Sequence, residues 1–547
     1  MVATPSFPLT DSPWLRAQPL NGPATEVSAL EALVNADHYR CLLGDVPTQV
    51  FAQLRLLLAI AHMALDGPYD IAEWSRLWAD RRLPAEPIRE YLTRPEIRDR
   101  MDLLHPDTPF YQVATLHTAK NEVFGLERLI ADVPAGERFF TTRDGPGLER
   151  LTFAEAARWL VHCQAFDVSG IKSGAIGDSR VKGGKGYPIG QGQCGHLGGV
   201  YAEGANLAET LLLNLVPIQQ FDGYLDPQRD VPVWHRPPHT AAAEDPDGET
   251  GRPYGPLDLY TWQSRRIRLF TDAEGVTGVL ICNGDKFAAP NQHNVEPMTS
   301  WRRSKNQERV LKQALVYMPR THIPSRSLWR GLESLLPSAI PGDSDPDNRP
   351  PKLLEWLAAA ELAGHLEPSY RIRLHATGAV YGTQNSVLEE LVDDAVTMPV
   401  VLLAEENGAL RTLVRDAVAV AELAVRCAAA LAGNLERARG ADPDTAAAAR
   451  GRVHTDAYAR LDAPFRRWLA ELGQDTDVHS ARLDWEQDVR TQISRLGGEL
   501  IDAVGPKAWV GREIDGRILD SSLAETWFRA ALRRALPLAH STKEATA

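Results

Sequence analysis

The stretch VRTQISRLGGELIDAV, residues 489–504, carries the clearest periodicity in the chain. Its apolar residues are spaced four, three, four and four positions apart, at Val489, Ile493, Leu496, Leu500 and Val504. An α-helix turns once in about 3.6 residues, so this spacing puts all five side chains on one face. The stretch therefore predicts a helix whose apolar face needs a partner to cover it.

Three further helical patterns of the same kind surround this one. They run from about Val400 to Ala438, from about Asp444 to Leu472, and from Leu523 to Leu536. In the last of them the apolar stripe is expected at Leu523, Trp527 and Ala531. Because four apolar stripes are not stable in water, we predict that residues 391–547 form an all-α four-helix bundle. The alternative is that the four helices pack separately on the preceding domain.

The composition changes upstream of about residue 390. Short apolar runs alternate there with turns rich in glycine and proline, and the helical patterns are brief, as at Thr48–Ala64, Phe153–Cys163 and Asn206–Leu215. The chain of 547 residues is also long enough for two cores. We therefore predict that residues 1–390 form an α+β domain of mixed helices and short strands.

The charge and the cysteines exclude several classes of protein. There are 59 Lys and Arg against 72 Asp and Glu, a formal net charge of −13, which argues against a protein that coats nucleic acid by itself. No uninterrupted apolar run reaches the roughly 18 residues that span a bilayer, and Met1–Arg16 does not resemble a signal peptide. The 5 cysteines have no CxxC spacing. We expect a cytoplasmic protein without membrane association, disulfide framework or metal site.

Several short motifs match catalytic or cofactor patterns but lack the context that those patterns need. Gly190–Gly195 matches GxGxxG, yet a glycine-rich loop precedes it instead of a strand. Ser169–Lys172 matches SxxK, but flanking glycines disfavour the helix that would align the serine and the lysine. Asp343–Asp347 lacks the turn glycine of a calcium loop, and prolines separate His235 from His239. We expect neither an enzyme nor a cofactor.

One segment suits contact with a nucleic-acid backbone. Between Ser169 and Gly199 there are eleven glycines, which let a backbone approach a ligand closely. Basic residues lie among them, at Lys172, Arg180, Lys182 and Lys185. A flexible surface loop with ordinary lysines explains the composition equally well, and a nucleotide-binding enzyme that uses residues 170–199 is a third interpretation.

Two further polar stretches are candidates for ligand contact. Residues Arg265–Lys312 contain nine basic and five acidic residues, and Lys286 lies there on an expected turn after Gly284 and Asp285. Tyr381–Ser386 is either a helix-capping turn or a polar tip that enters a groove. For the basic stretch the simpler interpretation is a solvated charged face.

The order of several stretches resembles one family. They are LTFAEAARWLVHCQAFDVSGIKSG (residues 151–174), FPLTDSPW (7–14), HPDTPFYQ (105–112) and NLAETLLLNL (206–215). Together they are similar to CasA, the large subunit of the type I-E CRISPR surveillance complex, Cascade, and the likeness extends over most of the chain. In such complexes guide RNA reads the target by base pairing, and protein reads a short adjacent motif, the PAM.

The resemblance implies a non-catalytic subunit for antiviral defence. Its partners are the other Cascade subunits with their crRNA, double-stranded target DNA, and a helicase–nuclease that is recruited once the R-loop is complete. Members of this family read the PAM from the minor groove with a glycine loop, a lysine finger and a glutamine wedge. A purely structural scaffold subunit is the remaining alternative.

Carried over to this sequence, the resemblance implies specific residues. The glycine loop corresponds to Ser169, Gly170, Ile171, Lys172, Ser173 and Gly174. The lysine finger corresponds to Lys286, and the wedge to Gln384 with Thr383 and Asn385 beside it. The loop that docks on the complex corresponds to Arg138–Gly145, in particular Arg138, Phe139, Phe140, Thr141 and Thr142. Arg180, Lys182 and Lys185 are candidates for phosphate contacts.

Overall fold

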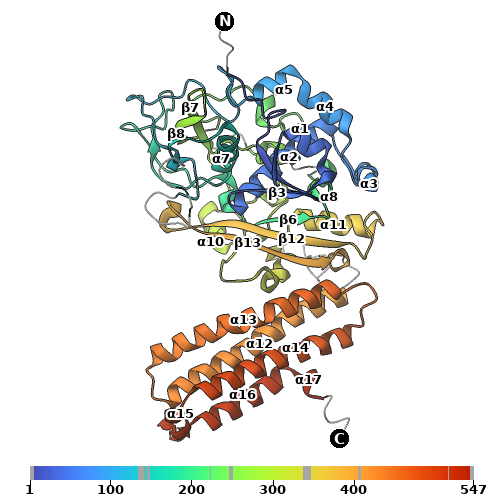
Figure 1. The fold of residues 1–547 in the computed structure, drawn as a ribbon, viewed down its shortest axis with the longest axis vertical. Helices are drawn as coiled ribbons and strands as arrows, with labels where there is room; N and C mark the ends of the chain where they lie inside the picture. The colour runs from blue at the N-terminus through green and yellow to red at the C-terminus, as the bar shows by residue number, and fades with distance from the viewer. Residues whose placement is uncertain are drawn as a thin grey trace. The chain divides into compact units, whose positions relative to one another are not determined.

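A computed structural model describes residues 5–133, 141, 143, 148–221, 223, 225–245, 251–336, 347–404, 408–514 and 516–541. The chain divides into two compact units (Figure 1). Unit 1 comprises Met1–Arg326, Ile340–His365 and Ile372–Ala395, and unit 2 comprises Ser327–Ala339, Leu366–Arg371 and Val396–Ala547. Two short segments from before residue 390 thus belong to unit 2.

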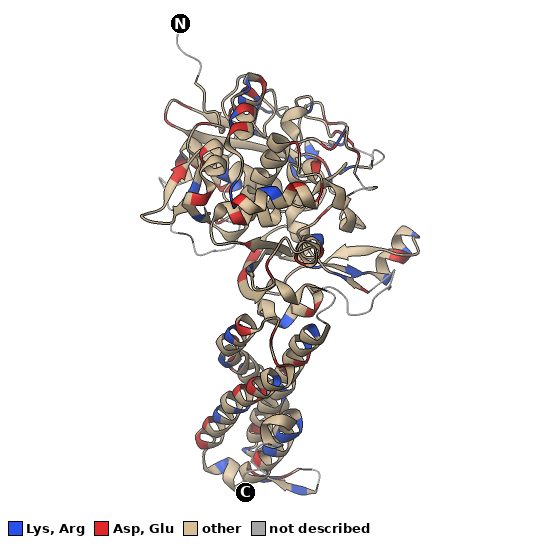
Figure 2. Cartoon of the chain, turned by 90° about the vertical axis from the view of Figure 1, so that its right-hand side faces the viewer, with Lys and Arg blue, Asp and Glu red and all other residues tan. Residues whose placement is uncertain are grey.

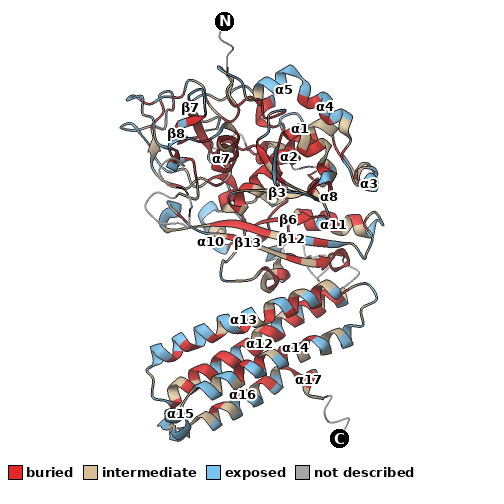
Figure 3. Cartoon of the chain, viewed as in Figure 1, coloured by how far each residue is buried: buried red, intermediate tan, exposed pale blue. Residues whose placement is uncertain are grey.

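Helix α2 (Pro47–Leu65) forms the centre of unit 1. Its residues Leu56–Ile60 are completely buried, and helices α4, α7, α8 and α9 pack around it (Figure 3). Each fully buried leucine or isoleucine contributes roughly 1.5–3 kcal/mol. The guanidinium of Arg55 donates to both carboxylate oxygens of Glu296 over 3.0 and 2.8 Å, and this buried ion pair ties α2 to a distant part of unit 1.

The other α-helices that the structure describes in unit 1 are shorter than α2. They are α1 (Ala29–Val34), α3 (Ile71–Asp80), α4 (Ala85–Thr93), α5 (Pro95–Arg100), α7 (Phe153–Phe166), α8 (Leu207–Asn214), α9 (Pro256–Tyr260), α10 (Lys305–Leu311) and α11 (Lys352–Leu362). Thr152 caps α7 and Asn206 caps α8, each by accepting the N–H of a glutamate three residues on. The helices expected at 153–163 and 206–215 are present as α7 and α8.

The strands form small antiparallel sheets throughout the part of the chain that the structure describes. The first has the order β2-β1-β3, with β1 (Leu15–Pro19), β2 (Thr25–Val27) and β3 (Tyr39–Leu43). The second has the order β13-β12-β6, with β6 (Gly199–Glu203), β12 (Arg371–Tyr381) and β13 (Leu388–Pro399). The third has the order β10-β9-β11, with β9 (Trp301–Arg303), β10 (Tyr317–Pro319) and β11 (Asn348–Arg349). Two-stranded pairs join β4 (Lys172–Ser173) to β5 (Lys185–Gly186), β7 (Arg265–Thr271) to β8 (Val276–Asn283), and β14 (Arg512–Ile514) to β15 (Arg517–Leu519).

Unit 2 consists mainly of long helices. They are α12 (Gly408–Ala438), α13 (Pro443–Glu471), α14 (Val478–Ala503) and α16 (Ser521–Ala535), with the short α15 (Pro506–Val510) and α17 (Pro537–Ser541). Helix α12 packs against α13, α14 and α16, and the buried sides of the helices are visible in Figure 3. Gly497 of α14 allows the ring of Phe528 to approach, because an added Cβ there would lie 2.4 Å from a ring carbon.

Two details of unit 2 differ from the sequence-based expectation. Helix α12 begins at Gly408 instead of about Val400, because Val400–Leu402 is a buried 3-10 turn at the end of β13. In α16 the buried stripe is Ala524, Phe528 and Leu532, one residue later than expected, and Trp527 is 42% exposed. Both series have helical spacing, so periodicity alone did not distinguish them.

Among the residues that the structure describes, two helices are long and apolar enough to cross a membrane by length and composition alone, namely α2 and α12. Within the fold, 78% of the apolar window of α2 and 50% of that of α12 is buried. The hydropathy of α2 in particular is explained by its place in the core of unit 1.

Candidate nucleic-acid interface

The glycine-rich segment forms a small hairpin on unit 1. Lys172 pairs with Gly186 and Ser173 with Lys185, so β4 and β5 are antiparallel. Lys182 and Lys185 exchange backbone hydrogen bonds of 3.1 and 3.2 Å across Gly183 and Gly184, whose φ angles are +59° and +74°. A two-residue turn with positive φ at both central positions is the favoured connection of such a hairpin, and glycine adopts it without strain.

Gly174 is required where this hairpin closes. Its N–H donates to the carbonyl of Gly184 over 3.0 Å. An added Cβ would lie 2.5 Å from Cγ1 of Val181 and 2.7 Å from the backbone of Gly184. The residues that correspond to the glycine loop, Ser169–Gly174, therefore run from the end of α7 into a hairpin whose backbone leaves no room for a side chain at this point.

Ser169 links the hairpin to the turn that carries Gln384. Its buried N–H donates to the carbonyl of Asn385 over 2.7 Å. The next residue, Gly170, has a φ of +145° and open space around it, and Ile171 is 58% exposed. The expected glycine loop and the expected wedge are thus direct neighbours in space although more than two hundred residues separate them.

The wedge residues lie in the turn between β12 and β13. Thr383, Gln384 and Asn385 are all exposed, and the last two have φ angles of +58° and +55°. A hydrogen bond fixes this turn to α7, since the hydroxyl of Tyr381 donates to the carbonyl of Phe166 at the end of α7 over 2.8 Å. The structure has a strand after this turn, where the sequence suggested a helix start, so the capping interpretation is wrong.

Lys172 is engaged inside the protein. Its ammonium lies 2.6 Å from a carboxylate oxygen of Asp167, which also accepts from Arg265 at 2.5 Å. Burial favours a higher pKa for Asp167, but the charges of Lys172 and Arg265 outweigh burial and hold this pKa below its usual range. The Lys172 side chain is only 14% exposed, so its ion pair with Asp167 is an internal contact that stabilises the hairpin.

The other basic residues of the segment differ in whether a carboxylate pairs with them. Arg180 forms a bidentate pair with Asp178, with two contacts of 3.0 Å, and is also held close to the carbonyl of Asn283. Lys182 and Lys185 are both exposed on the hairpin turn. Of the three candidate phosphate contacts, the two lysines are therefore the ones whose charge faces solvent.

Lys286 is an exposed residue between two buried anchors. Asp285 on one side is 2% exposed, and its carbonyl accepts from the indole of Trp262 over 3.1 Å. Phe287 on the other side packs edge-on against the same indole. Asn283 of β8, three residues before Lys286, donates to the carbonyl of Tyr187 over 2.6 Å, so the start of the Lys286 turn rests on the hairpin.

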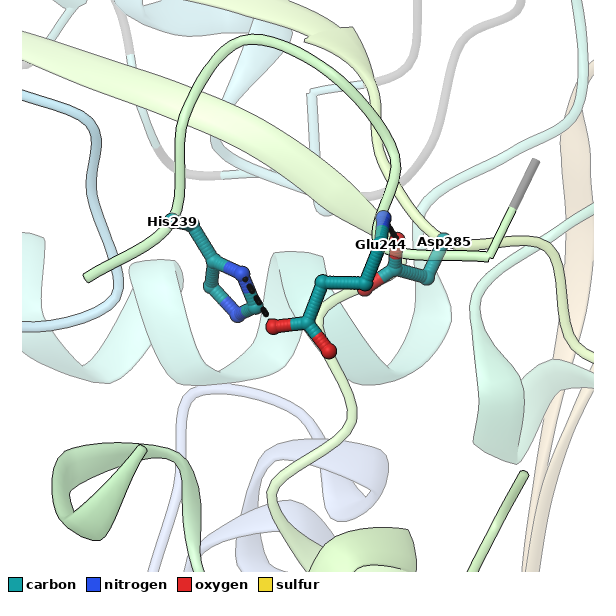
Figure 4. Close-up of side chains that lie close together, drawn as sticks. All are labelled: His239, Glu244 and Asp285. Atoms are coloured by element: carbon teal, nitrogen blue, oxygen red, sulfur yellow. Dashed lines mark hydrogen bonds and ion pairs between the residues drawn. The ribbon is translucent and has the colours of Figure 1, made fainter. Parts of the chain in front are cut away.

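An ionic cluster fixes the backbone beside Lys286. One ligand atom each of His239, Glu244 and Asp285 lies within 4.8 Å of the others, and Figure 4 shows the His239 ring directed at the Glu244 carboxylate. Asp285 accepts from the N–H of Glu244 over 2.8 Å. Arginines neutralise these carboxylates: Arg236 and Arg252 contact Glu244, while Arg252 and Arg266 contact Asp285.

The pKa values of this cluster reflect the arginines. Burial works against ionisation of Glu244, but His239, Arg252 and Arg236 lower its pKa to about 2. Burial lowers the pKa of His239, which favours its neutral form. A divalent cation at this place would be repelled by three guanidiniums, so the cluster suits a structural role better than metal binding. It also shows that Arg266, like Arg265, is buried and not part of a solvated charged face.

The glycines of the GxGxxG motif are used for packing. An added Cβ at Gly192 would lie 2.5 Å from the backbone of Ala165, and one at Gly195 would lie 2.5 Å from the hydroxyl of Tyr381. Only the short 3-10 helix η3 (Gln193–His196) follows. A dinucleotide site needs a preceding strand, a long helix and an open glycine backbone. This motif has a loop before it, a short 3-10 helix after it and glycines that are covered by neighbouring residues.

The expected docking loop lies mostly outside the described residues. This applies to Arg138, Phe139, Phe140 and Thr142. Thr141 is described, and its hydroxyl accepts the N–H of Arg143 over 3.1 Å. Arg143 in turn contacts Glu155 of α7 at 2.5 Å, which ties this part of the chain to unit 1.

Several residues that build the site were not singled out in the sequence. Asp167, Arg265, Asn283 and Tyr187 hold or extend the hairpin. The local signals for them are the Asn-Gly-Asp turn that follows β8 and the basic stretch that begins at Arg265. Lys and Arg are interspersed with Asp and Glu along the ribbon of both units in Figure 2, and the formal net charge is −13.

Comparisons with known proteins agree on one family. The family model described as CRISPR-associated protein Cse1 matches residues 8–496. A curated relative, the CRISPR-associated protein CasA/Cse1 of Thermus thermophilus, is 30% identical over 457 residues, which are 80% of this chain and 81% of the relative.

Solved structures give the same result. Cse1 of Thermobifida fusca is 49% identical with a TM-score of 0.91, covering 98% of this chain and 99% of that one. Cse1 of Acidimicrobium ferrooxidans is 30% identical with a TM-score of 0.80, covering 99% of each chain. A chain of a structure titled CRISPR RNA-guided surveillance complex shares the fold at a TM-score of 0.63 and 18% identity, covering 91% of this chain and 99% of that one. The family match over most of the sequence shows that this chain belongs to the Cse1, or CasA, family of CRISPR-associated proteins.

Proposed function

We propose that the protein is the non-catalytic large subunit of a type I-E CRISPR surveillance complex and recognises the PAM in double-stranded DNA from the minor groove. It then starts duplex opening so that crRNA can pair and form the R-loop. The observation that carries this proposal is the backbone hydrogen bond from Ser169 to Asn385, which joins the residues corresponding to a glycine loop and to a wedge. The family membership supports the same function.

In this proposal each element has a separate physical role. Gly170, which has open space around it, brings a backbone without a side chain into a groove that is only about 6 Å wide. Lys286 donates to acceptors on the floor of the groove, where A·T and T·A pairs look alike, so several PAM sequences are tolerated. Gln384 enters between base steps, and the unstacking cost of a few kcal/mol is offset by contacts to the opened duplex.

The partners follow from the same proposal. Other Cascade subunits and crRNA surround the chain, and the loop that includes Arg138–Thr142 docks on them. We propose that residues 1–390 carry the DNA-reading loops, that residues 391–547 form the four-helix bundle, and that a helicase–nuclease is recruited after R-loop formation. The protein would work in the cytoplasm, where the complex meets invading DNA.

Two substitutions in the assembled complex test the DNA-reading roles. Lys286→Ala should weaken binding of a PAM-bearing duplex by roughly 5- to 150-fold, since a lost groove contact costs about 1–3 kcal/mol. Gln384→Ala should slow strand opening more than it weakens binding, which 2-aminopurine fluorescence next to the PAM reports. Lys305→Ala, which removes an exposed lysine of α10, is the charge-matched control and should change neither quantity.

Wild-type binding and opening in both site variants would contradict this proposal. That result would favour the scaffold interpretation. The nucleotide-binding interpretation makes a different claim, namely that a nucleotide raises the melting temperature of the chain. The packed glycines at 192 and 195 argue against it.

A further inference from the structure

The β4–β5 hairpin has two faces with different chemistry. Side chains alternate along a strand, and residues opposite each other in an antiparallel pair share a face. Lys172 and its partner Gly186 lie on the inner face, where Lys172 meets Asp167 and Gly186 abuts the Asn283 amide. Ser173 and its partner Lys185 therefore lie on the outer face.

The outer face extends beyond these two residues. Lys182 is the bridge partner of Lys185 across the turn, so both lysines are on this face. Continuing the register by one residue at the other end sets Ile171 opposite Tyr187. We define the outer face by Ile171, Ser173, Lys182, Lys185 and Tyr187.

Two of these residues are apolar side chains that unit 1 leaves uncovered. Ile171 is 58% exposed and Tyr187 is 55% exposed. These two side chains share one face of the hairpin with two exposed lysines, and such a grouping makes the face a candidate contact surface. The 2.6 Å hydrogen bond from the Asn283 amide holds the backbone carbonyl of Tyr187, so the point from which the side chain projects is fixed.

We infer that this outer face binds the sugar–phosphate backbone of duplex DNA, with Tyr187 as a DNA-positioning residue; the inference rests on the proposed function. Ile171 and the ring of Tyr187 pack against deoxyribose, which is the apolar part of the groove wall. Lys182 and Lys185 neutralise phosphates at its rim. The occupant is DNA because the face shares Ile171 and Ser173 with the segment proposed to read the PAM.

The lysines and the apolar side chains of the outer face should affect the affinity for DNA in different ways. A lysine on a phosphate releases a counterion, so its loss changes the dependence of binding on salt. An apolar contact to sugar does not. Neither contact reads a base, so both should contribute equally to duplexes with and without a PAM, unlike Lys286.

The experiment uses the assembled complex loaded with a guide that is not complementary to the probe duplex. Base pairing then adds nothing, and fluorescence anisotropy reports protein contacts alone. Tyr187→Ala should weaken binding of PAM and non-PAM duplexes alike by roughly 5-fold, with an unchanged salt slope. Tyr187→Phe should retain most of the affinity because the ring remains. Lys185→Ala should reduce the slope of log Kobs against log salt by about one.

Tyr69→Ala, which removes a 49% exposed tyrosine elsewhere in unit 1, is the control and should bind as the wild type does. Wild-type affinity of Tyr187→Ala overturns the inference. So does loss of another subunit from the complex in this variant, because the face would then be a protein contact. If Lys286→Ala impairs PAM binding while Tyr187→Ala and Lys185→Ala do not, only this inference fails; if none of the three has an effect, the proposed function fails too.

Discussion

At the scale of single residues, basic side chains that look alike in the sequence have different environments. Lys172 and Arg180 are paired with Asp167 and Asp178, while Lys182 and Lys185 face solvent. Their separation along the chain does not predict this division. The division depends on where the carboxylates are buried. A buried carboxylate without a partner is costly, so each one is paired with a nearby basic side chain.

Lys172 should therefore matter for stability more than for phosphate binding. We expect Lys172→Met to reduce the free energy of unfolding by about 1–3 kcal/mol, since Asp167 keeps only Arg265 as a charged partner. The pKa of Asp167 should rise at the same time. Lys182→Met removes an exposed charge and should change stability by less than about 0.5 kcal/mol. Urea unfolding measures the stability of both variants. Equal stability would argue against a stabilising role for the Lys172–Asp167 ion pair.

At the scale of elements, two backbone turns create the site. The hairpin turn at Gly183–Gly184 aims two lysines outward, and the turn between β12 and β13 places Gln384 in a left-handed conformation that non-glycine residues seldom adopt. Sequence patterns identified both stretches but left the second open between a helix-capping turn and a polar tip. Turn chemistry is ambiguous for Gly-Thr-Gln-Asn-Ser, because the same polar residues cap helices and close hairpins.

Gly174 gives a direct test of the hairpin. Gly174→Ala should open it, since the new methyl group would overlap Val181 and the Gly184 backbone. Gly183→Asn is the matched control, because asparagine tolerates a φ of +59° and nothing lies within 4 Å. Tryptic cleavage after Lys182 and Lys185 should be faster in Gly174→Ala and unchanged in Gly183→Asn. Similar cleavage rates in both variants would mean that the close contact at Gly174 does not hold the hairpin.

At the scale of the whole molecule, unit 1 buries ionisable groups that link its stability to pH. Burial lowers the pKa of His62 and of His196 to about 4, against about 6.5 for an unfolded chain. Between these values the unfolded state binds more protons, so each imidazole makes the fold less stable as pH falls. Asp230 works in the opposite direction, because burial raises its pKa to about 7.

The variant His62→Gln isolates the contribution of the His62 imidazole to the pH dependence of stability from that of the Asp230 carboxyl. We expect wild-type stability, relative to that of His62→Gln, to fall as pH is lowered from 7 to 5, because glutamine cannot take up the proton that the unfolded chain binds at His62. Its amide can still donate to the carbonyl of Gly67, which lies 3.1 Å from the imidazole. Urea midpoints at several pH values give the comparison. A constant difference between the two proteins would contradict the lowered pKa.

The sequence by itself determined the element types wherever a local pattern repeats. The spacing of Val489, Ile493 and Leu496 specified the buried side of α14, and the helices expected at 153–163 and 206–215 are present as α7 and α8. The order of several stretches was enough for the family. These features are local, or are preserved as strings of residues, so no knowledge of packing is needed to read them.

Only the tertiary structure decided how the candidate site is assembled. Ser169 meets Asn385, Asp167 meets Arg265, and Asn283 meets Tyr187 through contacts between residues 96 to 216 positions apart. Such contacts depend on how α7, β8 and the β12–β13 turn pack, which no local periodicity encodes. The buried stripe of α16 shows the same limit, because Trp527 and Phe528 fit the helical spacing equally well, and only the packing of Phe528 against Gly497 on the neighbouring helix shows which of them is buried.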